Sequence, residues 1–286
     1  MKNNRRLYPI TLMARVLNVA RSGYYAWYSR KPSDRQFRDI VLRVLIREAH
    51  TLSRQTYGSI RIQRELAAHG QYAGRDHITR LRKEMGLRCI QIKKFKATTN
   101  SKHGLPISPN RVDQKFAITT PGMIWGTDIT YIATLEGWLY LAGVKDFGSR
   151  EILGYSMGSR MTTELVREAL ANAIRLRKPL PGCIHHSDRG SQYCSHEYRN
   201  DIAKAGLLSS MSRTGNCFDN APTESFWGCL KQEMVYHRRF RTREEAKTAI
   251  REYIEIFYNR VRRHSKIGYV APSIYAESFY FQRRSA

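Results

Sequence analysis

The chain has 286 residues, and its 49 Lys and Arg side chains outnumber its 24 Asp and Glu side chains, which gives a formal net charge of +25. Its length allows a sizeable core and two or three domains, while five cysteines without a CxxC pair indicate reduced thiols in a cytosol and disfavour a disulfide framework or a zinc site. No uncharged run approaches the roughly 20 residues that cross a bilayer, and the N-terminus has no apolar core with a cleavage site, so we expect neither a membrane protein nor a secreted one.

The positive charge is concentrated at the two ends of the chain. Residues 1–115 carry 25 basic and 7 acidic side chains, residues 116–236 carry 12 of each, and residues 237–286 carry 12 and 5. Basic arms of this kind neutralise phosphates and release counterions, which is typical of salt-sensitive nucleic-acid binding. The alternatives are a basic protein without a polyanionic partner, or a membrane-surface protein, which lacks support because no long Lys-rich amphipathic helix is present.

The first expected elements are two short helices within residues 11–30. Apolar residues follow the helical spacing in the first helix, and Ser22 is placed to cap the second. The pair is similar to a helix-turn-helix, so we expect a helix-turn-helix-like segment at residues 1–32. Contact between this segment and DNA stays open, because any short helix pair with a tight turn has the same pattern.

Residues 33–90 are expected to form a basic three-helix DNA-binding domain. Gly70 and Gly86 stand where a left-handed residue ends a helix. The three helices are expected at residues 37–50, 60–69 and 76–85. The apolar side of the first is expected to comprise Phe37, Ile40, Val41, Val44 and Leu45. The basic side chains expected to contact DNA are Arg61, Arg64, Arg80 and Arg82. The alternative is a linker bundle whose charges face only water.

Residues 91–115 contain several lysines and two X-Pro steps, which predicts a basic linker. Lys93 and Lys94 in this linker are further expected DNA contacts.

The neutral centre, residues 116–236, has alternating strand and helix patterns. Three β-type runs at residues 123–133, 138–146 and 151–157 predict an antiparallel meander. Helices are then expected at residues 162–177 and 195–205, with short strands at residues 183–186 and 207–211 and a further helix after residue 220. This order predicts a mixed sheet with helices on its faces.

The C-terminal part, residues 237–286, is expected to be a basic helix and tail. The helix is predicted over residues 242–263, with Ala246, Ile250 and Phe257 on its inward side.

Three acidic residues are candidate metal ligands. Asp128 lies in the middle of the first strand, where a charge is expensive to bury unless a cation compensates it. Asp188 follows the fourth strand, and it lies beside Asp128 if strands one and four are neighbours. Glu224 belongs to the helix after residue 220, and Lys231, seven residues later, shares its face roughly 10 Å along the axis. Three carboxylates without a His/Cys cluster suit Mg²⁺ or Mn²⁺, and two such ions can catalyse phosphoryl transfer.

Other interpretations of individual residues stay open. Each aspartate alone is more often structural, and Asp219, a rival third ligand, is explained fully as a helix cap. Asp146 and Asp201 are expected in turns or on the surface. His185 and His186 point in opposite directions along a strand, which disfavours a joint metal site. The tryptophans expected in the core are Trp125, Trp138 and Trp227.

The segments that surround the acids resemble the DDE integrase core of bacterial insertion-sequence transposases, specifically the second reading frame product of the IS3 family. They are Trp125-Gly-Thr-Asp128, His186-Ser-Asp-Arg-Gly-Ser-Gln-Tyr193, Ser212-Arg-Thr-Gly-Asn-Cys-Phe-Asp-Asn220 and Glu224-Ser-Phe-Trp-Gly-Cys-Leu-Lys231. The 35 residues between Asp188 and Glu224 match the family's interval, and Tyr258, Asn259, Arg262, His264, Gly268 and Pro272 match its C-terminal signature. Cys194 and Ile267 depart from the residues that are usual in the family.

The resemblance implies an α/β fold with an RNase H-like mixed five-stranded sheet, preceded by an all-α helix-turn-helix-type region. It implies Mg²⁺-dependent cleavage at the ends of a DNA element and strand transfer, with Asp128, Asp188 and Glu224 as ligands of two ions. It also implies that Lys231 contacts the DNA end. The zinc-binding module of retroviral integrases is not expected, because the N-terminal part contains only Cys89.

The resemblance further implies the partners of the chain. They are double-stranded DNA, as terminal inverted repeats and target, and the product of an upstream reading frame, either as a separate chain or as a frameshift fusion. Synapsis of two ends implies at least a dimer, in the bacterial cytoplasm at the nucleoid.

Six further residues are candidate DNA contacts with a structural alternative. The alternative for Gln192 and Tyr193 is packing inside the protein. For Asn216 and Asn220 it is orientation of their loop, and for Arg262 and His264 it is a structural cap of the final helix. Two other functions compete with transposition: an RNase H-like or junction nuclease without joining activity, and a non-catalytic DNA-binding relic of an element.

Overall fold

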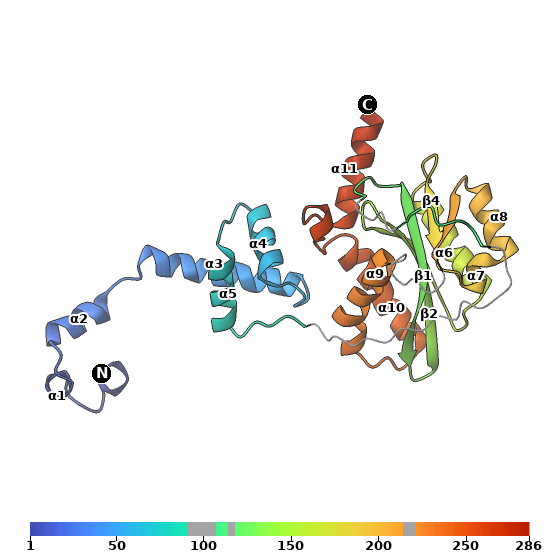
Figure 1. Cartoon of the computed structure of the whole chain (residues 1–286). Coiled ribbons are helices and arrows are strands. Elements are labelled where there is room, and N and C mark those ends of the chain that lie inside the picture. The colour runs from blue at the N-terminus through green and yellow to red at the C-terminus, as the bar shows by residue number, and fades with distance from the viewer. Residues whose placement is uncertain (91–106, 114–117, 214–220, 286) are drawn as a thin grey trace.

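The structure, a computed structural model, describes residues 1–90, 107–113, 118–213 and 221–285. Helices at the N-terminal end precede a sheet with helices on both faces (Figure 1). The N-terminal helices are η1 Lys2–Asn4, α1 Ile10–Val16, α2 Arg21–Ser29, α3 Asp34–Leu52, α4 Ser59–Ala68 and α5 Arg75–Glu84. The strands are β1 Ile124–Thr134, β2 Gly137–Asp146, β3 Ile152–Gly158, β4 Ile184–Ser187 and β5 Leu208–Met211. The later helices are α6 Thr163–Leu176, α7 Ser191–Cys194, α8 His196–Lys204, α9 Ala221–Glu233, η3 Val235–His237, α10 Arg243–Glu252, η4 Tyr253–Tyr258, η5 Ser265–Ile267 and α11 Pro272–Ser285. Within these described ranges, no helix is both long and apolar enough to cross a membrane.

The two expected N-terminal helices are present as α1 and α2, and Figure 1 places them far from the sheet. The expected cap is wrong: α2 begins at Arg21 after Ala20, so Ser22 lies inside the helix, where no side chain caps it. Ala14 and Tyr24 are buried in this segment, whereas Val16 and Leu17 are exposed.

Helices α3, α4 and α5 share one hydrophobic cluster. Gly70 and Gly86 end α4 and α5 with φ of 73° and 69°, as the sequence predicts. The cluster comprises Leu42, Ile46, Ala49, Tyr57, Ile62, Leu66, Ile78 and Leu81.

The expected apolar side of α3 is largely wrong. Phe37 is 65% exposed and Val44 is 54% exposed, because α4 and α5 pack against the neighbouring stripe that contains Leu42 and Ile46. Asp39 is buried on this packed side, where it accepts hydrogen bonds from His77 and Arg80. The helix therefore has two apolar stripes, and the spacing alone does not select between them.

The sheet has the strand order β3-β2-β1-β4-β5. β1 is antiparallel to β2 and parallel to β4, and β4 is parallel to β5. The mixed five-stranded sheet and its antiparallel meander are therefore confirmed. Helices α6, α7 and α8 pack on one face around Trp125 and Val144, while α9, α10 and η4 pack on the other around Leu139 and Leu141.

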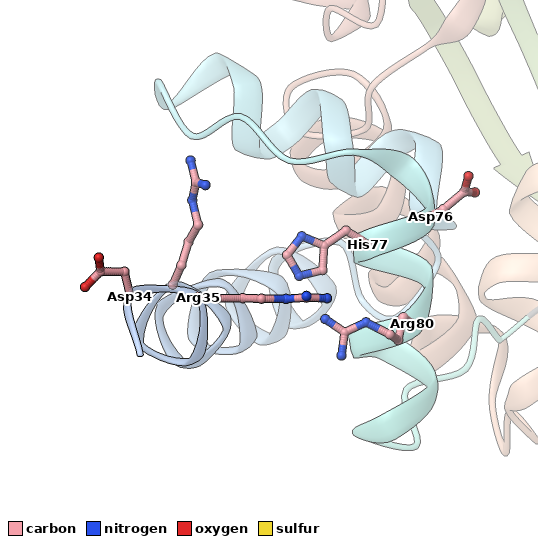
Figure 2. A pocket seen from close by; sticks show the side chains of 6 residues that line it. Asp34, Arg35, Asp76, His77 and Arg80 are labelled. Atoms are coloured by element: carbon pink, nitrogen blue, oxygen red, sulfur yellow. The ribbon is translucent and has the colours of Figure 1, made fainter. Parts of the chain in front are cut away.

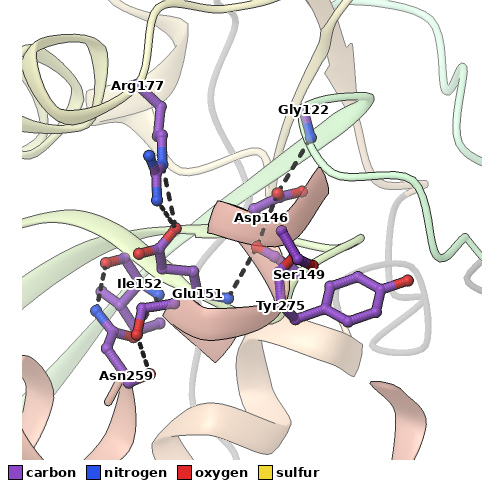
Figure 3. Close-up of polar contacts among 10 residues, drawn as sticks. Gly122, Asp146, Ser149, Glu151, Ile152, Arg177, Asn259 and Tyr275 are labelled. Carbon is purple, nitrogen blue, oxygen red and sulfur yellow. Dashed lines mark hydrogen bonds and ion pairs between the residues drawn. The ribbon is translucent and has the colours of Figure 1, made fainter. Parts of the chain in front are cut away.

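The long C-terminal helix predicted over residues 242–263 is shorter than expected. α10 runs into the π-helical turn η4, which ends at Tyr258. Asn259 explains the end, because its side chain accepts a hydrogen bond from the backbone N–H of Ile152 (3.0 Å) and donates one to the Ile152 carbonyl (2.9 Å; Figure 3). The next helix, α11, was not predicted, and its Tyr275 hydroxyl donates to the Thr119 carbonyl at 3.0 Å.

The turn between β2 and β3 is organised by Asp146. Its carboxylate accepts hydrogen bonds from the backbone N–H groups of Gly122 and Gly148 and from the Ser149 hydroxyl at 2.8–3.1 Å (Figure 3). Asp146 is buried, so of its two expected positions, in a turn or on the surface, it has the first. Its role is structural, as expected for a turn.

The three-helix unit is attached to the segment after α10. The Tyr57 hydroxyl donates to the Val261 carbonyl at 3.2 Å and accepts from the Arg263 backbone N–H at 2.6 Å. Arg263 also pairs with Glu65 at 2.6 Å. The basic helical unit is thus joined to the C-terminal side of the core. The domain boundaries proposed from the sequence stay predictions.

Candidate active site

The three predicted acids come from three elements that meet at one end of the sheet. Asp128 lies within β1, Asp188 directly follows β4, and Glu224 lies in the first turn of α9. β1 and β4 are parallel neighbours, so the end of β4 delivers Asp188 next to β1, as the sequence predicts. The turn of α9 then brings Glu224 to the same region.

The carboxylates lie in one another's electrostatic field. Burial, the charge of Asp188 and, more weakly, the charge of Glu224 raise the pKa of Asp128 to about 8. Burial and Asp188 also raise the pKa of Glu224. Each acid thus makes ionisation of the others more costly, a pattern common at functional sites.

The two aspartates are held by hydrogen bonds. Asp128 Oδ1 accepts from the backbone N–H of Ile129 at 2.8 Å, and its Oδ2 accepts from the indole N–H of Trp227 at 3.0 Å. Asp188 Oδ1 accepts from the backbone N–H of Gly190 at 2.9 Å. The two hydrogen bonds to Asp128 fix the plane of its carboxylate, and the bond from Gly190 positions one oxygen of Asp188.

The donor chemistry at this end of the sheet fits a divalent cation with a preference for oxygen. The acids supply hard oxygen ligands, and a bound cation would offset both the burial and the repulsion that raise the pKa of Asp128. His185 and His186 are not part of the set, because each is buried, against Tyr198 and Ser210 respectively. Among the described residues, no three His, Cys, Asp or Glu side chains are already close enough to hold an ion in common.

Lys231 lies on α9 at the edge of the acid cluster. Its ammonium lies 5.0 Å from the centre of the Tyr131 ring, over the ring face, and burial lowers its pKa. A partly buried lysine beside the acids is well placed for an anionic group. Gln192 lies near Asp188 in the chain and donates to the Met161 carbonyl at 3.2 Å.

Tyr193, Arg262 and His264, which were predicted to contact DNA, have packed or bonded surroundings within the protein. Tyr193 is 1% exposed within the core cluster. Arg262 is 3% exposed and forms an ion pair with Glu233 at 2.7 Å. His264 accepts from the Lys266 backbone N–H and so caps the start of η5, not the long helix that its capping alternative named; burial with nearby cations lowers its pKa to about 3. The ring is therefore neutral and has no charge for a phosphate.

The four arginines predicted on the helical unit have different surroundings. Arg64 is exposed and lies over the Tyr269 ring at 5.3 Å, whereas Arg61 is partly buried and faces the core. Arg80 pairs with two acids, and Arg82 donates to Ser59 and Cys89 within the unit. Arg61 and Arg82 therefore do not lie on the outer face where the sequence places them. Lys93, Lys94, Asn216, Asn220 and Asp219 lie outside the described residues.

A basic cleft between α3 and α5 was missed by the sequence analysis. Its volume is about 830 Å³, and Figure 2 shows His77 and Arg80 of α5 facing α3 across it. The lining residues are Asp34, Arg35, Arg38, Asp76, His77 and Arg80. The sequence does not distinguish Arg35 and Arg38 from other solvent-facing charges, because the cleft exists only where α5 lies against α3.

Two residues behind the acids were also missed. Trp227 was assigned to the core, and it is buried there, but it also bonds Asp128. Lys145 is buried, with its ammonium 2.8 Å from the Pro222 carbonyl, and burial lowers its pKa to about 7. The sequence signal for Lys145 was a lysine at the end of the otherwise apolar run in β2, where a buried charge needs a partner. The third tryptophan expected in the core, Trp138, is 50% exposed instead.

The chain is similar to known proteins over most of its length. The integrase core domain family matches residues 119–217, a second integrase core domain family matches residues 224–278, and an HTH-like domain family matches residues 36–95. The chain is 55% identical over 268 residues to the insertion element IS600 uncharacterized 31 kDa protein of Shigella sonnei, covering 94% of this chain and 98% of that one. It is 41% identical to the transposase InsF for insertion sequence IS3A of Escherichia coli (strain K12), covering 93% of each chain. Among solved structures, it is similar to the catalytic core domain of BIV integrase, with 20% identity, a TM-score of 0.43, and coverage of 57% of this chain and 99% of that one.

Proposed function

Because the chain belongs to the IS3-family transposases, with an integrase core domain and an HTH-like domain, we propose that it cuts the ends of its element and joins them to target DNA through Asp128, Asp188 and Glu224. The observation that carries the proposal is the proximity of these three carboxylates: burial first, then the charge of Asp188 and more weakly that of Glu224, raises the pKa of Asp128 to about 8. A cluster of acids of this kind is stable only with protons or with cations.

We assign the three acids as ligands of two Mg²⁺ or Mn²⁺ ions. When bound, such ions lower the pKa of an attacking water or 3′-hydroxyl and stabilise the leaving oxygen of an in-line displacement. The contribution of the protein is orientation. Asp128 is held by two N–H donors, Asp188 is held by the turn after β4, and α9 carries Glu224 to them.

DNA binds to the same face and to the basic helical unit. Lys231 is assigned to the phosphates next to the cut, because it lies seven residues after Glu224 on α9. Gln192 is assigned to DNA beside Asp188, and Arg64 to DNA on the helical unit, since it is exposed there. We keep Arg80, Lys93, Lys94, Asn216 and Asn220 as proposed contacts. The active species is proposed to be at least a dimer on two ends, with the upstream reading frame product as a separate partner or as a fusion.

The test is cleavage of a labelled terminal repeat in Mg²⁺ by the wild type and by three isosteric variants. Asp128→Asn, Asp188→Asn and Glu224→Gln are expected to lose more than about a hundredfold in rate while they keep DNA binding, since loss of a supporting hydrogen bond alone costs 10–100-fold at metal sites. Asp201→Asn is the matched control, because Asp201 pairs with Arg167 at 2.6 Å on the surface of α8. It is expected to cleave at the wild-type rate.

The remaining outcomes separate the competing functions. Cleavage without joined products would favour a nuclease of the RNase H type, and DNA binding without cleavage by the wild type would favour a non-catalytic relic. An inactive Asp219→Asn variant beside an active Glu224→Gln variant would show that the third ligand is assigned wrongly.

A further inference from the structure

The indole of Trp227 links the helix of the third acid to the strand of the first. Trp227 lies one turn after Glu224 on α9, and its Nε1 donates to Asp128 Oδ2 at 3.0 Å. The side chain is 6% exposed, so the hydrogen bond is shielded from water. Movement of α9 therefore changes the position of Glu224 and the orientation of Asp128 together.

The sheet has a specific place for this indole at Gly143. Gly143 is the cross-strand partner of Asp128 on β2, so the two residues point to the same face. A Cβ at Gly143 would lie 2.8 Å from Cη2 of Trp227, closer than side-chain contacts allow. The absence of a side chain there lets the ring lie on the strand directly beside the acid.

The start of α9 is fixed to the same face of the sheet by two neighbouring positions. Lys145, two residues after Gly143, donates to the Pro222 carbonyl at 2.8 Å. Gly126, two residues before Asp128, leaves space first for the Phe147 ring and then for the Thr223 hydroxyl, which would lie 2.7 Å from a Cβ. The position of the indole is therefore determined by the packing of the helix and does not depend on a flexible side chain.

The chemistry of the indole suits a support for a metal ligand. It donates one hydrogen bond, accepts none and carries no charge, so it orients a carboxylate without competing for a cation or neutralising the acid. Hydrogen bonds of this kind behind metal ligands tune both affinity and geometry.

We propose that Trp227 is a positioning residue that holds Asp128 in its metal-binding orientation, an inference that rests on the proposed role of Asp128 as a ligand. Gly143 is the second part of this device, because it makes room for the ring. The residue acts through Asp128 and does not touch DNA or the reacting atoms.

The experiment measures Mn²⁺ affinity by calorimetry on the full chain without DNA, together with the Mg²⁺ dependence of cleavage. Trp227→Phe removes the N–H group and keeps an aromatic ring. Its Mn²⁺ dissociation constant and the Mg²⁺ concentration for half-maximal cleavage are expected to rise 10–100-fold. Gly143→Ala, which displaces the indole without changing any acid, is expected to shift both quantities in the same direction.

Trp125→Phe is the matched control. Trp125 lies three residues before Asp128 on the same strand, and its Nε1 is buried without a hydrogen-bond partner among the described residues. The same substitution there changes core packing and melting temperature, and Mn²⁺ affinity is expected to stay within about twofold, since no metal ligand loses a hydrogen bond. This comparison separates positioning from a general loss of stability.

Unchanged Mn²⁺ affinity in Trp227→Phe would overturn the proposal, and if that variant does not fold, unchanged affinity in Gly143→Ala would do so. A wild type that binds Mn²⁺ through Asp128 but does not cleave DNA would refute the proposed function alone. A wild type that binds no Mn²⁺ would refute the ligand assignment and the role of Trp227 with it.

Discussion

Asp128 shows how one side chain can combine a structural cost with a chemical role. It is a carboxylate on a central strand, and burial with the charge of Asp188 raises its pKa to about 8. The folded chain therefore holds a proton there that the unfolded chain loses near the ordinary pKa of 3.8. In the proposed function, a bound cation would take the place of that proton.

The pH dependence of metal binding follows from this shift. Because the metal needs the ionised carboxylate, Mn²⁺ affinity is expected to rise roughly tenfold per pH unit below the pKa of about 8 and to level off above it. The sign for stability is opposite: without metal, the folded state binds more protons than the unfolded state, so stability falls as the pH rises from about 4 to 8.

Calorimetric Mn²⁺ titration across pH 5.5–9 tests the rise of Mn²⁺ affinity with pH, and urea denaturation over the same range tests the fall of stability with pH. Asp128→Asn is the matched variant, since it removes the titrating group and is expected to flatten the contribution of this position to stability. A Mn²⁺ affinity independent of pH below 8 would contradict the assignment.

The proposed ligands could be selected from the sequence, because a charge in mid-strand is costly to bury and the carboxyl end of a parallel strand is a common place for a site. The surroundings of Arg262, Tyr193 and Trp227 could not be predicted from the sequence. Arg262 belongs to a predicted family signature, but the sequence gives its charge and not its burial against Glu233. Trp227 has the spacing of a core residue, and the second role of its N–H group depends on β1, almost one hundred residues earlier.

Helix α9 and the turn η4 are tied together behind the acids by a buried ion pair. Arg262 donates to Glu233 through Nε and Nη2, and the Tyr253 hydroxyl donates to the same carboxylate at 2.8 Å. Both charged groups are almost fully buried. This network fixes the C-terminal end of the helix that carries Glu224.

Arg262→Met is expected to destabilise the chain by about 3–5 kcal/mol, because it leaves the Glu233 carboxylate buried without its cation. The measurement is the free energy of unfolding in urea. Arg260→Met is the matched control, since Arg260 is exposed and its loss is expected to cost less than about 0.5 kcal/mol. Normal stability with weakened DNA binding in Arg262→Met would instead restore the phosphate role expected from the sequence.

The strands and several helix ends were easier to predict than the helix faces, since α4, α5, α6 and α8 also lie within one residue of their expected ends. Alternation and turn residues are local signals, and β1 to β5 lie within two residues of their expected ends. The end of the C-terminal helix depends on the hydrogen bonds between Asn259 and Ile152, which lie 107 residues apart. The packed side of α3 likewise depends on which stripe α4 and α5 cover.

The net charge of the chain overstates the charge that is free to meet DNA. Several arginines of the helical unit already have acidic partners, as Arg80 does with Asp39 and Glu84. Others lie within the unit or face the core, as Arg82 and Arg61 do. The salt dependence of DNA binding is therefore expected to be smaller than the count of basic residues suggests.

The slope of the logarithm of DNA affinity against the logarithm of salt concentration measures this salt dependence. Arg64→Ala is expected to reduce the slope by about 1, as for loss of one phosphate contact. Arg80→Ala is the matched comparison and is expected to change the slope less, because its guanidinium is balanced by two carboxylates. Fluorescence anisotropy of a labelled duplex between 50 and 200 mM salt gives both slopes, and equal reductions would contradict the assignment.

The bonds that join Tyr57 to Arg263 and Arg54 to Glu252 connect residues 206 and 198 positions apart. On the ribosome, the basic helices therefore emerge long before the segment that anchors them. A polypeptide whose synthesis stops before that segment would keep the helical unit and lose its attachment to the cutting centre. We expect such truncated products to occupy the element's ends without cutting them, so that incomplete translation would itself limit how often the element moves.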